Sequence, residues 1–170
     1  GARDLYPFIL SPAVIEKLSG LKIDHALKTG TDIGPVVDQR QLAGNLKYID
    51  IARAEGGLVA FGGEPLKRET AGFFQQPALI TETTNAMRIN REEVFGPVAS
   101  VIRATDYEQA LFIANDTEFG LSAGICTTSL KYASHFKRNA EAGMVMVNLP
   151  TAGVDYHVPF GGRKGSSYGS

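Results

Sequence analysis

The second half of the chain alternates short apolar stretches with stretches of helical spacing, and this alternation constrains the fold most strongly. Strands are predicted over Val98–Ala104, Leu121–Thr127 and Gly143–Asn148. Asp106 and Ser129 each stand between two of these strands, where the N-cap of a helix is expected. Strands that alternate with helices of about ten residues favour right-handed crossovers and parallel pairing. The sequence therefore predicts an α/β fold with a mostly parallel sheet flanked by helices.

The composition of these elements also predicts their burial. The helix after Asp106 is expected to bury Ala110, Leu111 and Ala114 as one stripe. The stretch Gly143–Asn148 is apolar without a break, which is typical of a strand buried on both faces. Ligands of such sheets bind outside the carboxyl ends of the strands, so the loops after the strands are the places where a site is expected.

The first half of the chain is less regular. A short helix is predicted over Val14–Lys22. Asp38 is expected to cap a longer helix that ends at Gly56–Gly57. Leu58–Phe61 and Ala78–Ile80 are predicted strands, since each is a short apolar run bounded by glycine or proline.

The composition is that of a globular protein and argues against several classes. Of the 170 residues, 44% are hydrophobic and 21% are charged, and the formal net charge is −1. No basic run is interleaved with aromatic residues, and no apolar run is long enough to span a bilayer, so neither a nucleic acid nor a membrane is expected as a partner. The three histidines show no metal-ligand spacing, so no metal site is expected. The single cysteine excludes an internal disulfide and favours a reducing compartment, which predicts a cytoplasmic protein.

That cysteine, Cys126, is the first candidate for catalysis. It lies shortly before Ser129, and a cysteine near a helix start can act as a nucleophile. The run Leu121–Cys126 equally fits a strand whose last small side chain packs inside, and free cysteines are among the most buried residues. We therefore expect Cys126 to be buried and structural, with hydrolase chemistry as the weaker alternative.

The stretch Arg91–Pro97, REEVFGP, is the second candidate, and its spacing leaves two interpretations open. In the first, Glu92 and Glu93 solvate a helical turn while Phe95 fills the core. In the second, the chain leaves the turn in an extended conformation, so that Glu93 and Phe95 share one face. A carboxylate on such a face accepts hydrogen bonds from paired hydroxyls, such as those of a ribose, and the ring supplies an apolar contact.

Three motifs follow one another in the second half of the chain: Glu92–Pro97, Asn115–Gly124 and Pro159–Ser166. In this order and spacing they resemble the NAD(P)-dependent aldehyde dehydrogenase superfamily. The resemblance covers residues 22–169, with Asp32–Pro35 as a fourth, weaker match. Two further stretches, Gly124–Lys131 and Met144–His157, are most similar to the α-ketoglutaric semialdehyde dehydrogenase branch. The resemblance implies a fold like the catalytic domain of this family, in incomplete form.

The family oxidises an aldehyde to a carboxylate through a thioester. A cysteine thiolate attacks the carbonyl, hydride passes to the nicotinamide, and a water activated by a glutamate hydrolyses the thioester. The resemblance implies that NAD or NADP is the cofactor and a small aldehyde the substrate, in a homo-oligomer. It also implies that Glu93 holds the nicotinamide ribose and that Phe95 packs beside it.

The resemblance further implies a set of substrate-binding residues. The loop Leu149–Pro159 matches the loop that anchors the substrate in this family, and Phe160 follows it near the aldehyde pocket. Within the loop, Thr151 or His157 is expected to contact a carboxylated substrate.

The match is incomplete in ways that affect the expected activity. The nucleophilic cysteine, the general-base glutamate and the Rossmann-like domain of the family all precede the matched region, and Cys126 does not correspond to the nucleophile. We divide the chain into a poorly matching N-terminal segment, residues 1–21, and the C-terminal part of a catalytic domain, residues 22–170. The glycine-rich stretch 161–170 closes no element, which indicates a longer protein. Alone, the chain is expected to be inactive and to bind neither NAD nor NADP.

The alternative is a non-enzymatic α/β module that serves binding or assembly. A fold does not imply a function, so the same elements can persist without the chemistry. An upstream cysteine segment and a cofactor domain in the same reading frame would distinguish the enzyme from the module.

Overall fold

The computed structural model describes residues 12–153 and 156–167, which fall into two compact units. Unit 1 runs from Gly1 to Arg103 and unit 2 from Ala104 to Ser170, and each is described by itself. Of the predicted segment 1–21, residues 1–11 lie outside the described residues, and the rest forms helix α2, Pro12–Ser19, and the turn after it. This helix begins at Pro12, since proline fits the first helical position, where no N–H is needed.

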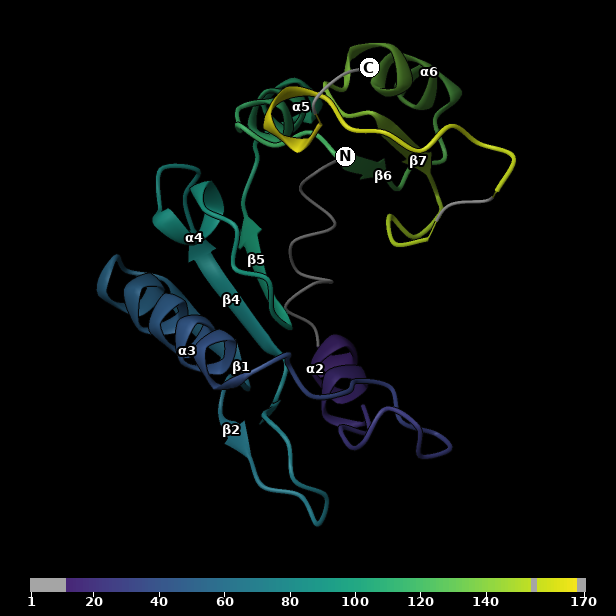
Figure 1. The fold of residues 1–170 in the computed structure, drawn as a ribbon. Helices are drawn as coiled ribbons and strands as arrows, with labels where there is room; N and C mark the ends of the chain where they lie inside the picture. The colour runs from purple at the N-terminus through teal and green to yellow at the C-terminus, as the bar shows by residue number, and fades with distance from the viewer. Residues whose placement is uncertain (1–11, 154–155, 168–170) are drawn as a thin grey trace. The chain divides into compact units, whose positions relative to one another are not determined.

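Unit 1 is built on a three-stranded sheet in the order β1–β4–β5 (Figure 1). Its central strand β4 (Ala78–Thr83) pairs parallel with β5 (Val98–Ile102) and antiparallel with β1 (Leu58–Phe61). Parallel neighbours need a long crossover, usually a helix. The chain between β1 and β4 instead forms a small hairpin of β2 (Pro65–Leu66) and β3 (Phe74–Gln75), so β1 joins the sheet with the opposite direction.

Helix α3 (Gln39–Ala54) covers one face of this sheet and supplies Ile49 and Ala52 to its core (Figure 1). As predicted, Asp38 caps it: the carboxylate accepts a hydrogen bond from the backbone N–H of Gln41 at 2.7 Å. Helix α4 (Arg88–Arg91) follows β4 and packs against α3. The buried core cluster consists of Ile49, Ala52, Ala78, Ile80 and Ile89.

The described residues of unit 2 contain one pair of strands, β6 and β7, which run parallel and in register. The predicted caps Asp106 and Ser129 are confirmed, since each side chain accepts a hydrogen bond from a backbone N–H of its helix. Both units therefore combine helices with parallel strand pairs, which confirms the predicted α/β class. The elements of unit 2 are α5 (Tyr107–Asn115), β6 (Ser122–Ile125), α6 (Leu130–Asn139), β7 (Met144–Val147) and the 3₁₀ helix η2 (Lys164–Ser166).

Burial in unit 2 differs from the prediction. No residue of α5 is buried: Ala110 and Leu111 are half-buried and Ala114 is exposed. Of β7, Met144 is buried and the other three residues are half-buried, so this strand is not covered on both faces. The physical reason is that the described sheet of unit 2 has two strands, and helix α6 packs on β7.

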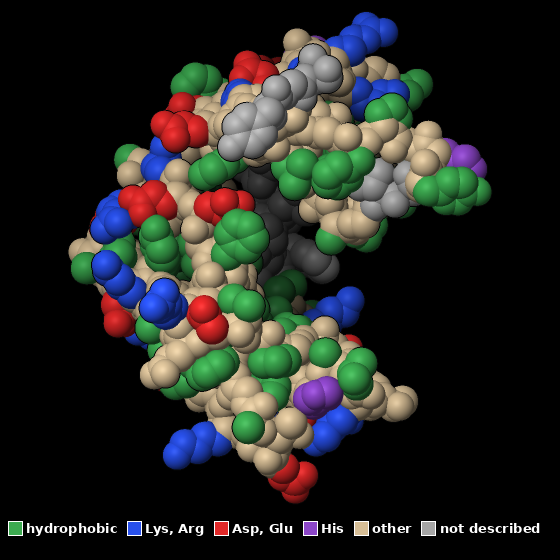
Figure 2. Space-filling model, in the orientation of Figure 1, with side chains coloured by type: hydrophobic (Ala, Val, Ile, Leu, Met, Phe, Trp, Pro, Cys, Tyr) green, Lys and Arg blue, Asp and Glu red, His purple; other side chains and the backbone are tan. Residues whose placement is uncertain are grey.

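Large apolar side chains are exposed in both units (Figure 2). Among them are Leu27 (89% exposed) and Val37 (84%) in unit 1, and Leu130 (81%) in unit 2. Single exposed apolar residues are common in proteins, so none of these is a site by itself. None of the described helices combines the length and the apolar character that crossing a membrane requires.

Candidate functional site

The segment 91–97 begins at an anchored glutamate. Arg88 holds the Glu92 carboxylate with two hydrogen bonds of 2.7 and 2.9 Å, and the hydroxyl of Tyr48 donates a third at 2.5 Å. The hydrogen bonds from Arg88 and then Tyr48 lower the pKa of Glu92 to about 2. Arg88 and Glu92 are one helical turn apart and Tyr48 belongs to α3, so this cluster ties the start of the segment to α3. Glu92 is therefore structural.

Glu93 and Phe95 lie on the surface of unit 1, on either side of a residue that points inward. Phe95 is 74% exposed and Glu93 is also exposed, whereas Val94 packs against the core cluster. The interpretation in which Phe95 fills the core is therefore wrong. Glu93 has no hydrogen bond or ion pair among the described residues, so its carboxylate is open to a ligand.

The backbone of this segment is not extended at Phe95, contrary to the second interpretation. Phe95 has φ = +55°, in the left-handed region. A bulky residue in this region is an outlier that costs about 1–2 kcal/mol, and such residues cluster at binding and catalytic sites. The chain turns here toward Gly96–Pro97 and β5. Glu93 and Phe95 are therefore both exposed to solvent, although the backbone between them is not a regular extended strand.

Three side-chain amides, those of Gln41, Asn45 and Gln75, lie directly beneath this segment, and we call them the amide cluster. Asn45 is 0% and Gln75 1% exposed. The Asn45 amide lies 2.7 Å from the Gln41 nitrogen and 2.9 Å from the Gln75 oxygen. The Gln41 nitrogen also donates to the Val94 carbonyl at 2.8 Å. The cluster thus joins α3, β3 and the segment 91–97.

Gly96 packs onto the same cluster without space for a side chain. A Cβ placed on Gly96 would lie 2.2 Å from the Asn45 side-chain nitrogen, well inside contact distance. Only glycine therefore fits here while Asn45 keeps its position. The amide cluster contacts the residues immediately before and after Phe95.

The predicted substrate residues Thr151, His157 and Phe160 all belong to unit 2 and are all exposed. The methyl carbon of Thr151 packs over the β6 backbone at Gly124. The His157 ring lies against that of Tyr156, with centroids 3.7 Å apart. Residues 154 and 155 of the predicted loop Leu149–Pro159 lie outside the described residues. The structure thus groups Glu93 with Phe95 in one unit and these three residues in the other.

Hydrogen bonds join the motif Asn115–Gly124 to the motif Pro159–Ser166. Gly120 accepts a hydrogen bond from the Arg163 N–H at 2.8 Å and donates to the Ser166 hydroxyl at 3.0 Å. The Gly165 N–H donates to the Glu118 carbonyl at 2.9 Å. Lys164, at φ = +53°, forms an ion pair with Glu141 at 2.7 Å and a hydrogen bond to the Asn115 carbonyl. The role of the two motifs within unit 2 is therefore structural, since their contacts fix the chain that follows Phe160.

Cys126 is exposed, so the expectation that it packs inside is wrong. The strand β6 ends at Ile125, and Cys126 lies in the turn beyond it. Within the described part of the chain, Cys126 has no hydrogen-bond partner, so no neighbouring base activates it. Among the same residues no cluster of three metal-binding side chains occurs.

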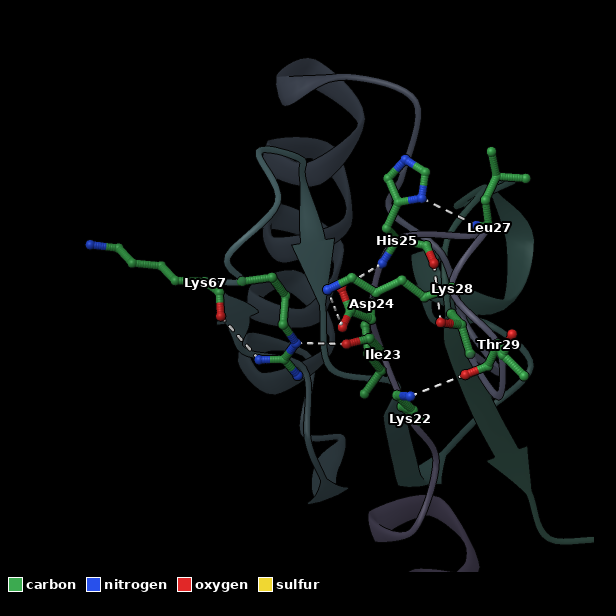
Figure 3. Close-up of polar contacts among 10 residues, drawn as sticks. Lys22, Ile23, Asp24, His25, Leu27, Lys28, Thr29 and Lys67 are labelled. Carbon is green, nitrogen blue, oxygen red and sulfur yellow. Dashed lines mark hydrogen bonds and ion pairs between the residues drawn. The ribbon is translucent and has the colours of Figure 1, made fainter.

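A second polar cluster of unit 1 is self-contained (Figure 3). The Asp24 carboxylate accepts hydrogen bonds from the His25 N–H at 2.7 Å and from the Lys28 ammonium at 3.0 Å, and these bonds lower its pKa. The Lys22 ammonium donates to the Thr29 carbonyl, and Arg68 holds the Ile23 carbonyl at 2.6 Å. These contacts close the surface loop 22–29 and tie it to Arg68, and they leave no converging set of groups for a ligand.

The amide cluster is the part of the site that the sequence reasoning missed. Asn45 lies four residues before Ile49 and seven before Ala52, which are the other buried residues of α3. The signal in the sequence was Asn45 itself, a polar residue at a position of the helix where an apolar residue is expected. Gln75 gave no signal, because its burial depends on its contact with Asn45, 30 residues earlier in the chain.

The model of the aldehyde dehydrogenase family matches residues 6–170. An α-ketoglutarate semialdehyde dehydrogenase of Haloferax volcanii is 48% identical over 142 residues, which are 81% of this chain and 30% of that protein. An α-ketoglutaric semialdehyde dehydrogenase of Bacillus subtilis is 38% identical over 91% of this chain and 32% of its own length. The predicted resemblance to this branch is confirmed.

Solved structures give the same answer for the fold. A betaine aldehyde dehydrogenase of Staphylococcus aureus in complex with NAD+ matches with a TM-score of 0.83 and 30% identity over 89% of this chain and 30% of that one. An indole-3-acetaldehyde dehydrogenase of P. syringae, in complex with NAD+ and IAA, matches with a TM-score of 0.84 and 40% identity over 90% and 31%. The chain spans about a third of the length of these relatives. With its three motifs and its fold in agreement, the chain belongs to the aldehyde dehydrogenase family.

Proposed function

We propose that residues 22–170 are the C-terminal part of the catalytic domain of an NAD(P)-dependent aldehyde dehydrogenase, in which Glu93 binds the nicotinamide ribose and Phe95 packs beside the nicotinamide. The observation that carries this proposal is the pair of exposed side chains on a segment that is anchored on both sides. An unpaired carboxylate suits two vicinal hydroxyls, and an exposed ring suits a flat heterocycle.

The chemistry of the reaction is divided between this chain and residues outside it. The cofactor, when bound, supplies the hydride acceptor. The described residues bind and orient: the Glu93 carboxylate accepts hydrogen bonds, and the Phe95 ring excludes water from one face. The family's thioester mechanism needs a thiolate, and exposed Cys126 has no activating partner among the described residues. On this proposal, the isolated chain is expected to show no turnover and no binding of NAD or NADP.

The substrate is an aldehyde, and the relatives that support the proposal are α-ketoglutarate semialdehyde dehydrogenases. We assign substrate binding to Thr151, His157 and Phe160, since a hydroxyl and an imidazole suit a carboxylated aldehyde and a ring suits its carbon chain. The enzyme acts as a homo-oligomer in the cytoplasm, in keeping with the exposed apolar side chains and the single free cysteine.

Cofactor binding is tested with Glu93→Gln and Phe95→Leu in the enzyme that contains this chain. Each variant is expected to raise the Kd for NAD+ about tenfold, since each removes one contact to the nicotinamide nucleoside. Glu69→Gln, an exposed carboxylate of the same unit, is the matched control. Titration calorimetry measures the three constants. Unchanged Kd values for both site variants would contradict the assignment of Glu93 and Phe95 to the cofactor site.

Substrate binding is tested with a variant that the structure makes selective. Thr151→Val keeps the methyl group that packs over β6 and removes only the hydroxyl. We expect KM for α-ketoglutaric semialdehyde to rise several-fold while KM for NAD+ stays the same. An equal rise for an aldehyde that carries no carboxylate would contradict the assignment.

An activity assay of the isolated 170-residue chain is the simplest test of whether catalysis needs residues outside it. The purified chain, mixed with α-ketoglutaric semialdehyde and NAD+, is expected to form no reduced cofactor. Turnover that survives Cys126→Ala would show catalysis by other groups, and turnover abolished by Cys126→Ala would assign the nucleophile to Cys126.

A further inference from the structure

Asn45 occupies a position that packing alone would give to an apolar residue. It continues the buried stripe of α3 through Ile49 and Ala52, and its side chain is 0% exposed. Burial of an amide costs about 1–3 kcal/mol unless hydrogen bonds compensate for it, and asparagine is also a poorer helix former than leucine. A leucine at this position would suit the core better.

The amide cluster around Asn45 is only partly satisfied. The Gln75 side-chain nitrogen is buried and has no hydrogen-bond partner among the described residues. A partly satisfied polar network is less stable than a well-packed apolar core. The cluster is thus a poor device for stability, which indicates that it serves another purpose.

The cluster contacts the segment 91–97 at the two points that determine how Phe95 is presented. Gln41 holds the Val94 carbonyl at 2.8 Å, and Asn45 packs against Gly96. If the Asn45 amide is turned by 180°, its nitrogen lies 3.0 Å from the same carbonyl oxygen, so either orientation joins α3 to the segment. These contacts stabilise the left-handed backbone at Phe95, which is unfavourable by itself.

We propose that Asn45 is a positioning residue: through the amide cluster it fixes the backbone on both sides of Phe95 and so presents Glu93 and Phe95 to the cofactor. This inference rests on the proposed function. It assigns a second role to α3, which otherwise serves as the cover of the β1–β4–β5 sheet. Displacement of a binding group by about 1 Å can cost orders of magnitude, so contacts that fix a backbone matter even without touching the ligand.

The test is Asn45→Leu in the enzyme that contains this chain. Leucine has the branching and the number of non-hydrogen side-chain atoms of asparagine, although its two methyl groups are larger, and it continues the apolar stripe. The gain in apolar burial is therefore expected to offset the tighter packing against Gly96, so that the thermal midpoint stays near that of the parent. The Kd for NAD+ is expected to rise about tenfold, while kcat at saturating NAD+ changes less than about twofold. Ala43→Leu, which adds the same residue to the exposed side of the same helix, is the control and should change none of the three.

A double-mutant cycle separates positioning from general damage. Asn45→Leu is combined with Glu93→Gln/Phe95→Leu, which removes the groups that Asn45 is said to position. If Asn45 acts through them, Asn45→Leu adds less than about a twofold further loss in that background. A full tenfold further loss would overturn the proposal, as would a lowered thermal midpoint with an unchanged Kd for NAD+.

Two further outcomes keep this inference distinct from the proposed function. If Glu93→Gln and Phe95→Leu leave the Kd unchanged, the cofactor assignment fails and the positioning role fails with it. If they raise the Kd but Asn45→Leu does not, only the positioning role fails. Gln75→Leu removes the cluster from the β3 side and is expected to repeat the pattern of Asn45→Leu. It decides the question if Asn45→Leu does not fold, and an unchanged Kd for Gln75→Leu would then overturn the proposal.

Discussion

Units 1 and 2 hold their candidate site residues by different means. In unit 1, side chains hold the segment 91–97: the Arg88–Glu92–Tyr48 cluster at its start, and the amide cluster beneath its middle. In unit 2, the chain that follows Phe160 is held mainly by backbone groups of the two motifs. Side chains can adjust when a neighbour changes, whereas backbone contacts of this kind leave little freedom. We therefore expect the chain around Gly161 in unit 2 to tolerate less change at its close contacts than the segment 91–97 in unit 1.

The largest expected effect compares two glycines. A Cβ on Gly143 would lie 2.0 Å from the carbonyl oxygen of Gly161, which is backbone, whereas a Cβ on Gly96 meets the side chain of Asn45. Gly143→Ala is expected to destabilise the protein by about 4 kcal/mol and Gly96→Ala by about 2 kcal/mol. Urea unfolding of both variants beside the parent measures the difference. A larger loss for Gly96→Ala would reverse the comparison.

The second prediction compares the packing of the units. Ile49 is 1% exposed at the centre of the core of unit 1, and Phe112 on α5 of unit 2 is 67% exposed. Ile49→Ala is expected to cost about 3 kcal/mol through the lost burial and the cavity, and Phe112→Ala less than about 0.5 kcal/mol. Thermal unfolding of the two variants is the measurement. A loss above about 1 kcal/mol for Phe112→Ala would show that α5 is packed more tightly than the structure indicates.

The third prediction sharpens the claim about backbone control in unit 2. Lys164 has φ = +53° and uses its side chain to pair with Glu141. Lys164→Ala loses the pair and keeps the strained backbone, whereas Lys164→Gly loses the pair and relieves the strain. Glycine is therefore expected to be more stable than alanine here by about 1 kcal/mol, the reverse of the usual order in a helix. Equal unfolding midpoints in urea would contradict this.

The smallest expected effect concerns the side-chain anchor of unit 1. The pKa of Glu92 falls from 4.5 to about 2 in the folded protein, so its contribution to stability is complete above pH 4.5 and is lost as the pH falls toward 2. The difference in thermal midpoint between the parent and Glu92→Gln is expected to shrink over this range. Because the cluster is exposed to solvent, the difference is small and decreases with added salt. A difference that stays constant with pH would show that the carboxylate does not act as an ion.

The sequence predicted the features of the fold that depend on contacts between residues close together in the chain. Asp38, Asp106 and Ser129 were expected as N-caps, and each accepts the expected hydrogen bond. The direction of β1, the exposure of Ala114 and the exposure of Cys126 were not predicted, because each depends on which elements pack beside it. The family motifs located Glu93 and Phe95, but their roles stay predictions.

The same reasoning explains why the contacts that hold the segment 91–97 were not predicted from the sequence. Glu92 was read with Glu93 as a solvating charge, yet its partners come from α4 and from Tyr48, 44 residues earlier in the chain. Gln75 lies 30 residues from Asn45 in sequence. Contacts between residues so far apart in sequence leave no periodic pattern. Of these contacts, only those of the amide cluster left a signal, namely the polar residue Asn45 in the buried stripe of α3.

The left-handed backbone at Phe95 has a consequence for protein engineering and for evolution. A screen for thermostability alone would favour glycine or asparagine at this position, since both adopt φ = +55° at lower cost. Under the proposed function, each of these exchanges removes the ring that the cofactor meets. Selection for heat resistance and selection for cofactor affinity therefore act in opposite directions at this one residue, and variants that gain one are expected to lose the other.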